Sequence, residues 1–360
     1  MQEHAGTSLV ATPALVIDES ILDANIARTA EFVASAGLAL RPHVKTHKSI
    51  EIARRQLAAG AVGITVATLS EAELFAEAGF DDIFIAYPLW IDESKTAILE
   101  HVLRLSSVIL GVDSVDGVRQ IARLGRARSG RLSLLVEVDS GHHRSGVQPQ
   151  DAGTLAAAAQ DAGLEVAGVF TFPGHSYSLE TRESAARDEQ RSLSIAAASL
   201  ADRGIQPRIV SGGSTPSLEF VRSSILTEVR PGVYVFGDAQ QWELGTTSPE
   251  SIALTVLATV VSRSPGRIIL DSGSKVLGAD RGAYSSGFGR LLDYPDARIT
   301  ALSEHHATVV GPDLPLGSRV RVVPNHVCAA INLIDEYLVA SADDRDRFGS
   351  WPIDARGRNR

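Results

Sequence analysis

The sequence predicts a two-domain α/β protein: a (β/α)8 barrel of the TIM type followed by a second, C-terminal β-rich domain. Three observations predict this fold class. Short β-branched runs alternate with alanine-rich segments of helical length from about residue 38 to 240, as expected of parallel strands joined by crossover helices. The helical rhythm stops after about residue 245. The hydrophobic content of 44% over 360 residues is ample for a large core.

Eight apolar runs are the candidate barrel strands, and eight is the number that closes a (β/α) barrel. They are Ala39–Val44, Gly63–Ala67, Asp82–Tyr87, Ser107–Val112, Leu132–Asp139, Glu165–Phe172, Pro207–Ser211 and Val229–Phe236. An open, doubly wound sheet would show the same alternation, so periodicity does not exclude it.

Helices between these runs carry ordinary start and stop signals. Ile21–Ala36 follows Ser20, a good N-cap residue, and stops at Gly37. Ile50–Ala59 and Glu71–Ala78 each end in a glycine as well.

Turn-separated strands without long helices are expected in the second domain. They are Ile252–Ser262, Arg267–Leu270, Arg298–Leu302, Ala307–Val310 and Ser318–Val323, with a possible edge strand at Trp351–Ile353 in a polar tail. We therefore expect a barrel over residues 14–243 and a β-rich domain over residues 244–360, to which residues 1–13 also belong.

The charge balance favours small-molecule chemistry. A net charge of −9 argues against nucleic acid as a partner, which needs a basic surface. The first ten residues lack a basic stretch followed by an apolar one, and no apolar run is long enough to span a membrane. The single cysteine, Cys328, fits a reducing compartment. We expect a cytoplasmic protein that does not bind membranes.

A lysine-rich segment holds the first candidate catalytic residue. The chain has only four lysines, and two of them, Lys45 and Lys48, lie just after the apolar run Leu38–Leu40. Neighbouring cations and burial lower the pKa of an ε-amine and make it nucleophilic toward aldehydes. Such cations are available here at Arg41, His43, His47 and Lys48. Lys45 is thus a candidate Schiff-base lysine, with a solvated basic strand end as the alternative.

Two glycine turns follow the seventh and eighth runs, where barrels commonly hold phosphate. Glycines let backbone N–H groups approach an anion, and neighbouring hydroxyls add donors. The candidate phosphate-binding residues are Ser211, Gly212, Gly213, Ser214, Thr215, Gly232 and Val233.

Polar side chains also follow the fifth and sixth runs. Arg144 lies in the loop after the fifth run and could reach the ring edge or phenolic oxygen of a cofactor. His175 and Tyr177 follow the sixth run and offer an imidazole and a phenol at the same mouth. A solvated arginine and structural aromatic residues are the alternatives.

A histidine and the only cysteine form a possible metal pair. Alternate residues of an extended strand point to one side, so His326 and Cys328 could present an imidazole and a thiolate to one ion. Two protein ligands would leave positions for water and substrate, as in catalytic zinc sites. A buried cysteine acting as a small hydrophobic residue is the alternative.

Taken together, these segments resemble a known enzyme family over nearly the whole chain. The family is that of the D-threonine aldolases and D-serine dehydratases, fold-type III pyridoxal-phosphate enzymes with an alanine-racemase-like barrel and a β domain. The residues that carry the resemblance are Thr12–Pro13, Ile17–Asp18, Pro42–Lys48, Ser211–Ser214, Arg230–Gly232, Asp271–Lys275, Asp280–Gly282 and Pro324–Cys328.

The resemblance implies roles for the candidate residues. Lys45 would form the Schiff base with pyridoxal 5'-phosphate, the two glycine turns would hold its phosphate, and Arg144 would lie beside its ring. His326 and Cys328 would bind a divalent metal, zinc, manganese or magnesium, near the β-hydroxyl of the substrate. The resemblance also suggests a homodimer.

The expected reaction is retro-aldol cleavage of a D-threonine-like amino acid to glycine and an aldehyde, with His175 or a metal-bound hydroxide as the base. The same residues would support D-serine dehydration to pyruvate and ammonia, and the His-x-Cys form resembles the zinc-dependent D-serine dehydratases. An amino-acid racemase using Tyr284, and a non-catalytic pyridoxal-phosphate carrier, are further alternatives.

Overall fold

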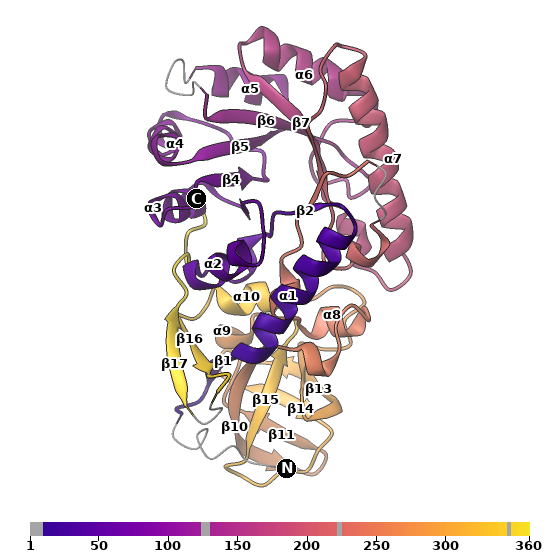
Figure 1. Ribbon diagram of the computed structural model, residues 1–360. Helices are drawn as coiled ribbons and strands as arrows, with labels where there is room; N and C mark the ends of the chain where they lie inside the picture. Colours follow the sequence, from indigo (N-terminus) through magenta and orange to yellow (C-terminus); the bar gives the residue numbers. More distant parts are fainter. Residues whose placement is uncertain (1–9, 124–129, 222–224, 344–346) are drawn as a thin grey trace. The chain divides into compact units, whose positions relative to one another are not determined.

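The chain forms two compact units in the computed structural model, which describes residues 10–123, 130–221, 225–343 and 347–360 (Figure 1). The first unit comprises residues 1–29, 46–51 and 233–357. The second unit comprises residues 30–45, 52–232 and 358–360. Each unit is built on a sheet of its own.

Eight parallel strands form the sheet of the second unit. Their spatial order is β2-β9-β8-β7-β6-β5-β4-β3, and a parallel bridge between His43 and Thr65 joins the two ends. The strands are β2 (Ala39–Leu40), β3 (Ile64–Val66), β4 (Asp82–Ile85), β5 (Ser107–Val112), β6 (Leu132–Glu137), β7 (Glu165–Phe170), β8 (Ile209–Gly212) and β9 (Glu228–Val229). The predicted eight-stranded (β/α) architecture is confirmed.

Helices cover the outside of these strands. Figure 1 shows α3 to α7 along the sheet, where α3 contacts β4, α4 contacts β5, and α7 contacts β7 and β8. The helices of the chain are α1 (Glu19–Ser35), α2 (Ile50–Ala58), α3 (Leu69–Glu77), α4 (Glu93–Leu105), α5 (Val115–Ala122), α6 (Ala152–Asp161), α7 (Arg182–Ala201), α8 (Ala239–Glu243), α9 (Ser274–Leu277) and α10 (Val327–Ile331). Within the described ranges, no helix combines the length and hydropathy needed to cross a membrane.

Two predicted strands are reduced to two residues each, and prolines explain both. The run Ala39–Val44 is a strand only over β2, because Pro42 has no N–H group for a sheet ladder. The prediction of a strand over Val229–Phe236 is wrong beyond β9: after Pro231 the chain turns into η7, the 3₁₀ turn Val233–Val235.

Aromatic rings fill the inside of the barrel. The rings of Phe84 and Phe170 meet edge to face with centroids 5.0 Å apart, and both are buried with Leu135. The guanidinium of Arg230 lies 5.4 and 5.3 Å from the two ring centroids, which suits a cation on a π face. Gly111 is required beside them, since a Cβ there would lie 2.7 Å from Phe170 Cζ.

A nine-stranded, mostly antiparallel sheet forms the first unit, and this confirms the predicted β-rich fold. Its order is β11-β14-β13-β12-β15-β10-β1-β16-β17, with β10 also pairing β11. The strands are β1 (Ala14–Asp18), β10 (Leu254–Ser264), β11 (Arg267–Leu270), β12 (Gly289–Leu291), β13 (Tyr294–Leu302), β14 (Ala307–Val310), β15 (Arg319–Pro324), β16 (Glu336–Ala340) and β17 (Phe348–Pro352). Strands β1, β12 and β16 were not predicted. The predicted edge strand at Trp351–Ile353 is present as β17, which lies at the edge of the sheet but begins at Phe348 and ends at Pro352.

Candidate functional site

Lys45 lies just after β2, in the 3₁₀ turn η2 (Val44–Thr46). Its Nζ atom is 5.9 Å from the centroid of the Phe172 ring, and the guanidinium of Arg144 is 5.3 Å from the same centroid. Tyr177 also faces this ring, with centroids 6.2 Å apart. The fold of the second unit thus brings three predicted site residues together around Phe172. Phe172 itself was not predicted as a site residue, although it follows β7.

The expected cationic field around Lys45 is smaller than predicted. Arg41 donates from Nη1 to Asp82 at 2.6 Å and from Nε to Glu228 at 3.0 Å, so two carboxylates balance its charge. Burial, helped by the charges of Lys45 and Arg230, holds the pKa of His43 well below its ordinary value. A neutral imidazole adds no full positive charge. Arg41 and His43 therefore contribute little to the positive field expected around Lys45.

The two other predicted cations belong to the first unit and have partners within it. Lys48 Nζ donates to the Ala355 carbonyl oxygen at 3.3 Å. His47 Nδ1 accepts the Ser49 backbone N–H at 3.1 Å. These contacts fix the start of α2 rather than the position of a lysine nucleophile.

Arg144 is placed by the loop after β6. Its Nη2 atom lies 4.0 Å from Glu137 Oε1, which also accepts the Ser145 hydroxyl at 2.9 Å. Burial raises the pKa of Glu137, although Ser145 and Arg144 oppose the shift. A small cavity of about 10 Å³ lies between these residues and Phe172.

The first glycine turn follows β8 and is tightly packed. Gly213 has a φ of +76°, the left-handed region that glycine adopts without strain. The Gly213 N–H donates to Glu189 Oε1 at 2.7 Å, and the Ser214 N–H donates to Ser217 Oγ at 2.9 Å. The Thr215 hydroxyl is buried without a hydrogen-bond partner.

Ser211 faces a buried charge network instead of the open turn. Its hydroxyl donates to Glu228 Oε1 at 2.7 Å and accepts from Arg230 Nε at 2.8 Å. The second glycine turn, after β9, lies at the boundary between the units. Gly232 belongs to the second unit, and Val233 is the first residue of η7 in the first unit, where it is buried.

His175 lies in the 3₁₀ turn η5 (Gly174–Ser176) after β7. Its two ring nitrogens have no hydrogen-bond partner, and Nε2 lies 3.6 Å from Asp188 Oδ2, beyond hydrogen-bonding range. The imidazole is therefore held in place by packing rather than by a committed partner.

His326 and Cys328 are neighbours, but not in the way the sequence indicated. The prediction of an extended strand is wrong here: β15 ends at Pro324, His326 is the N-cap residue of α10, and Cys328 lies in its first turn. The imidazole and the thiol are nevertheless in hydrogen-bonding contact. The tight strand-to-helix turn, rather than strand alternation, brings them together.

Both side chains have further partners in the first unit. His326 Nδ1 lies 2.5 Å from Asp280 Oδ2, and Cys328 Sγ lies 3.4 Å from Thr46 Oγ1. Burial disfavours the imidazolium, but Cys328 and Asp280 raise the pKa of His326 to about 11. Within the described residues, no group of three or more histidine, cysteine, aspartate or glutamate side chains could hold a metal ion.

Tyr284 is half-buried beside two carboxylates. Its hydroxyl donates to Gln240 Oε1 at 3.3 Å. Burial and the carboxylates of Asp238 and Glu243 raise the pKa of Tyr284 above its ordinary value. A phenol with a raised pKa stays protonated near neutral pH and acts as a hydrogen-bond donor.

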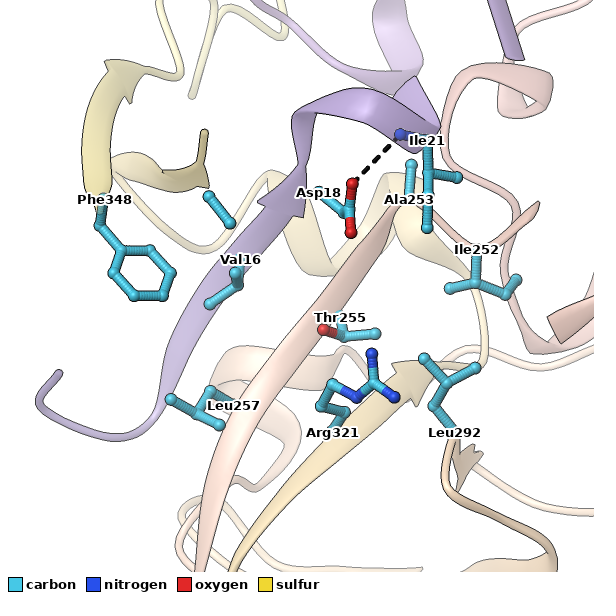
Figure 2. A pocket seen from close by; sticks show the side chains of 11 residues that line it. Val16, Asp18, Ile21, Ile252, Ala253, Thr255, Leu257, Leu292, Arg321 and Phe348 are labelled. Carbon is cyan, nitrogen blue, oxygen red and sulfur yellow. Dashed lines mark hydrogen bonds between the residues drawn. The ribbon is translucent and has the colours of Figure 1, made fainter. Parts of the chain in front are cut away.

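A larger cavity, of about 80 Å³, lies elsewhere in the first unit and contains none of the predicted site residues (Figure 2). Val16, Thr255 and Leu257 line it from β1 and β10. Figure 2 shows Asp18 bonded to the Ile21 N–H, at 3.2 Å. The lining is mainly apolar, and its polar side chains are those of Asp18, Thr255 and Arg321.

Two family models match the chain. The model of the alanine racemase N-terminal domain matches residues 17–240. The model of a putative serine dehydratase domain matches residues 253–340.

Curated relatives match over nearly their full length. The D-threo-3-hydroxyaspartate dehydratase of Delftia sp. (strain HT23) is 37% identical over 94% of this chain and 98% of its own. The D-threonine aldolase of Arthrobacter sp. is 36% identical over 98% of this chain and 94% of its own. The solved structure of the Delftia dehydratase has a TM-score of 0.88 at 35% identity and covers 96% of this chain and 97% of its own.

Mutant structures of D-threo-3-hydroxyaspartate dehydratase bear on the metal pair. One carries a histidine-to-alanine substitution, and another is a cysteine-to-alanine mutant in the metal-free form. The two substituted residues lie two positions apart in that enzyme, which is the spacing of His326 and Cys328 in this chain.

Proposed function

Because the chain belongs to the family of the alanine racemase N-terminal domain, we propose that it is a pyridoxal-phosphate- and divalent-metal-dependent lyase that dehydrates D-3-hydroxy amino acids. The products would be a 2-oxo acid and ammonia. One observation carries the choice of dehydration: His326 and Cys328 are in contact and have the spacing of the histidine and cysteine substituted in the dehydratase mutants.

The second unit fits pyridoxal phosphate. Thr215 Oγ1 is a buried polar atom without a partner, and such atoms normally have one, so the turn after β8 has a donor to offer a phosphate. Lys45 would hold the aldehyde end of the cofactor, and Arg144, which lies near the same Phe172 ring, would orient the cofactor ring.

The first unit fits one divalent ion. An imidazole and a thiol in contact form a donor set that suits zinc, and two protein ligands leave coordination positions open. Because Nδ1 of His326 faces Asp280, Nε2 is the nitrogen left for an ion. Cys328 would supply the thiolate, with Thr46 as its neighbour.

The bound groups supply what side chains lack: pyridoxal phosphate stabilises negative charge at Cα, and a divalent ion acts as a Lewis acid toward the β-hydroxyl. The chain supplies the proton transfers. Lys45 Nζ, which lies 5.9 Å from the centroid of the Phe172 ring, would remove the Cα proton. Overall, the substrate would lose its Cα proton and its β-hydroxyl as water, and addition of water at Cα with release of ammonia would give the 2-oxo acid.

Retro-aldol cleavage, the reaction expected first from the sequence, is the second candidate. It is favoured by the 36% identity to a D-threonine aldolase and by His175, whose ring nitrogens have no hydrogen-bond partner and could accept the β-hydroxyl proton. A His175→Gln variant that kept the full cleavage rate would remove His175 from this role.

A racemase and a non-catalytic carrier are less well supported. A racemase would need a second base, and Tyr284, whose pKa is raised, stays protonated near neutral pH. It would also leave the pair of His326 and Cys328 without a role. A carrier would bind the cofactor without turnover, and full-length similarity to two enzymes argues against that.

Product analysis tests the proposal. The metal-loaded protein is mixed with D-threonine, because this one substrate reports on both reactions. We expect 2-oxobutanoate and ammonia, whereas glycine and acetaldehyde would establish the aldolase instead. Parallel assays with D-serine and D-threo-3-hydroxyaspartate define the side chain preferred at Cβ, and loss of turnover on chelation counts against racemisation.

We also propose that the enzyme is a cytoplasmic homodimer. The single cysteine supports a reducing compartment, and the resemblance supports a dimer. Light scattering of the purified protein tests the dimer, and cell fractionation tests the compartment.

A further inference from the structure

Glu189 is a buried acid on α7 that the sequence gives no reason to notice. Its exposed fraction is 0%. Oε1 accepts the Gly213 N–H at 2.7 Å, and Oε2 is buried without a hydrogen-bond partner. The carboxyl therefore belongs physically to the glycine turn after β8 and not to the helix surface.

The turn and the carboxyl are packed against each other. A Cβ at Gly212 would lie 2.5 Å from Glu189 Oε1, so any larger residue there would displace the carboxyl group. Thr215, in the same turn, has the second unpartnered polar atom, Oγ1. Two unsatisfied buried atoms at one turn are costly unless a ligand completes them.

Arg230 is the charged group that faces Glu189 from the packed strands. Burial raises the pKa of Glu189 to about 7, while the Gly213 N–H and Arg230 lower it. Arg230 is itself shared, since Glu228 and Glu137 also face it and Ser211 accepts its Nε. One guanidinium thus faces three carboxyl groups, of which Glu228 also pairs with Arg41.

We propose that Glu189 is an unassigned part of the cofactor-binding turn and that it binds the phosphate-bearing cofactor only as a neutral carboxyl group, so that cofactor binding takes up a proton. The inference rests on the proposed cofactor. A phosphate monoester carries nearly two negative charges near neutral pH. An ionised Glu189 beside it would add repulsion in a poorly solvated place. A protonated carboxyl instead offers an O–H donor.

The test measures proton uptake without turnover. Full-length protein stripped of cofactor is titrated with pyridoxine 5'-phosphate, which has no aldehyde and so leaves Lys45 out of the proton balance. Calorimetry in two buffers of different ionisation enthalpy gives the protons taken up. We expect wild type to take up about one proton more than Glu189→Gln at about pH 8.5, because the neutral amide needs none.

Affinity gives an independent readout. The ratio of the wild-type Kd to the Glu189→Gln Kd should rise about tenfold per pH unit above about pH 7. Glu183→Gln is the matched control: Glu183 lies on the same helix, is exposed, and pairs with Arg187 at 2.8 Å. This variant should behave as wild type.

The outcomes separate the two proposals. Equal proton uptake by wild type and Glu189→Gln, or loss of binding in Glu189→Gln at every pH, overturns the inference and leaves the cofactor assignment standing. Failure of wild type to bind either pyridoxine or pyridoxal 5'-phosphate overturns both. Should Glu189→Gln not fold, infrared difference spectra of wild type decide: the carbonyl band of a protonated carboxyl must grow on binding at about pH 8.5.

Discussion

His326 Nδ1 lies 2.5 Å from Asp280 Oδ2, and this contact fixes the imidazole at the first residue of the turn into α10. Asn325 steadies the partner by donating from Nδ2 to the Asp280 carbonyl oxygen at 3.0 Å. A carboxylate on one imidazole nitrogen orients the other nitrogen and raises its basicity. Asp280 is thus a positioning residue for the proposed metal ligand.

Asp280→Ala should weaken metal binding about 10- to 100-fold, the usual effect of removing such a partner. The measurement is competition for zinc with a chelator of known affinity, which does not depend on turnover. Asp335→Ala is the control, because Asp335 is an exposed carboxylate of the same unit paired with Arg356 at 2.7 Å. An unchanged zinc affinity in Asp280→Ala would contradict the positioning role.

Lys45→Ala should lose turnover by more than about a hundredfold, since proton transfer by a positioned side chain contributes at least that much. It should also lose the visible absorbance that pyridoxal phosphate acquires on a lysine. Lys275→Ala is matched to it: Lys275 is exposed and pairs with Glu304 at 2.8 Å. If Lys45→Ala kept the absorbance and Lys275→Ala lost it, the assignment of the lysine would be wrong.

Arg41→Met should destabilise the protein by about 3–5 kcal/mol, because it removes the ion pair of the buried Glu228 carboxylate with Arg41. Urea unfolding at neutral pH gives the free energy of unfolding. Arg119→Ala, which breaks an exposed pair with Asp116, should change stability by less than about 1 kcal/mol. Equal effects of the two variants would argue against a buried charge network.

Because of Glu189, the free energy of unfolding of the cofactor-free protein should fall as pH rises. Its folded-state pKa of about 7 lies above the ordinary value of 4.5. The folded protein therefore keeps a proton that the unfolded chain has released between these values, and the free energy of unfolding falls as pH rises through this window. Above the folded pKa this stabilisation is gone.

The loss from Glu189 between about pH 5 and 8 should be about 2–3 kcal/mol. Asp238, whose pKa burial raises to about 6, acts in the same direction, so the comparison must be with Glu189→Gln. The difference between the two pH profiles, measured by urea unfolding, isolates Glu189. Parallel profiles would mean that Glu189 is not protonated in the folded state.

Local sequence patterns were enough to predict many of the strands in both units. Ser107–Val112 and Arg267–Leu270 are strands over the predicted residues, because an uninterrupted apolar or β-branched run can be buried only as regular structure. The candidate residues Lys45, Arg144 and Tyr177 were likewise found from their positions after strands, since the carboxyl ends of parallel strands meet at one mouth.

By itself the sequence determined the fold class, the family resemblance and the residues able to do chemistry, because periodicity and short motifs are local properties of the chain. Only the tertiary structure decided which of them meet. Strand β1 exists through pairing with β10 and β16, His326 reaches Cys328 through a turn, and Glu189 is buried against Gly213. Each depends on contacts between distant segments, and burial by those contacts sets the charge and partners of a side chain.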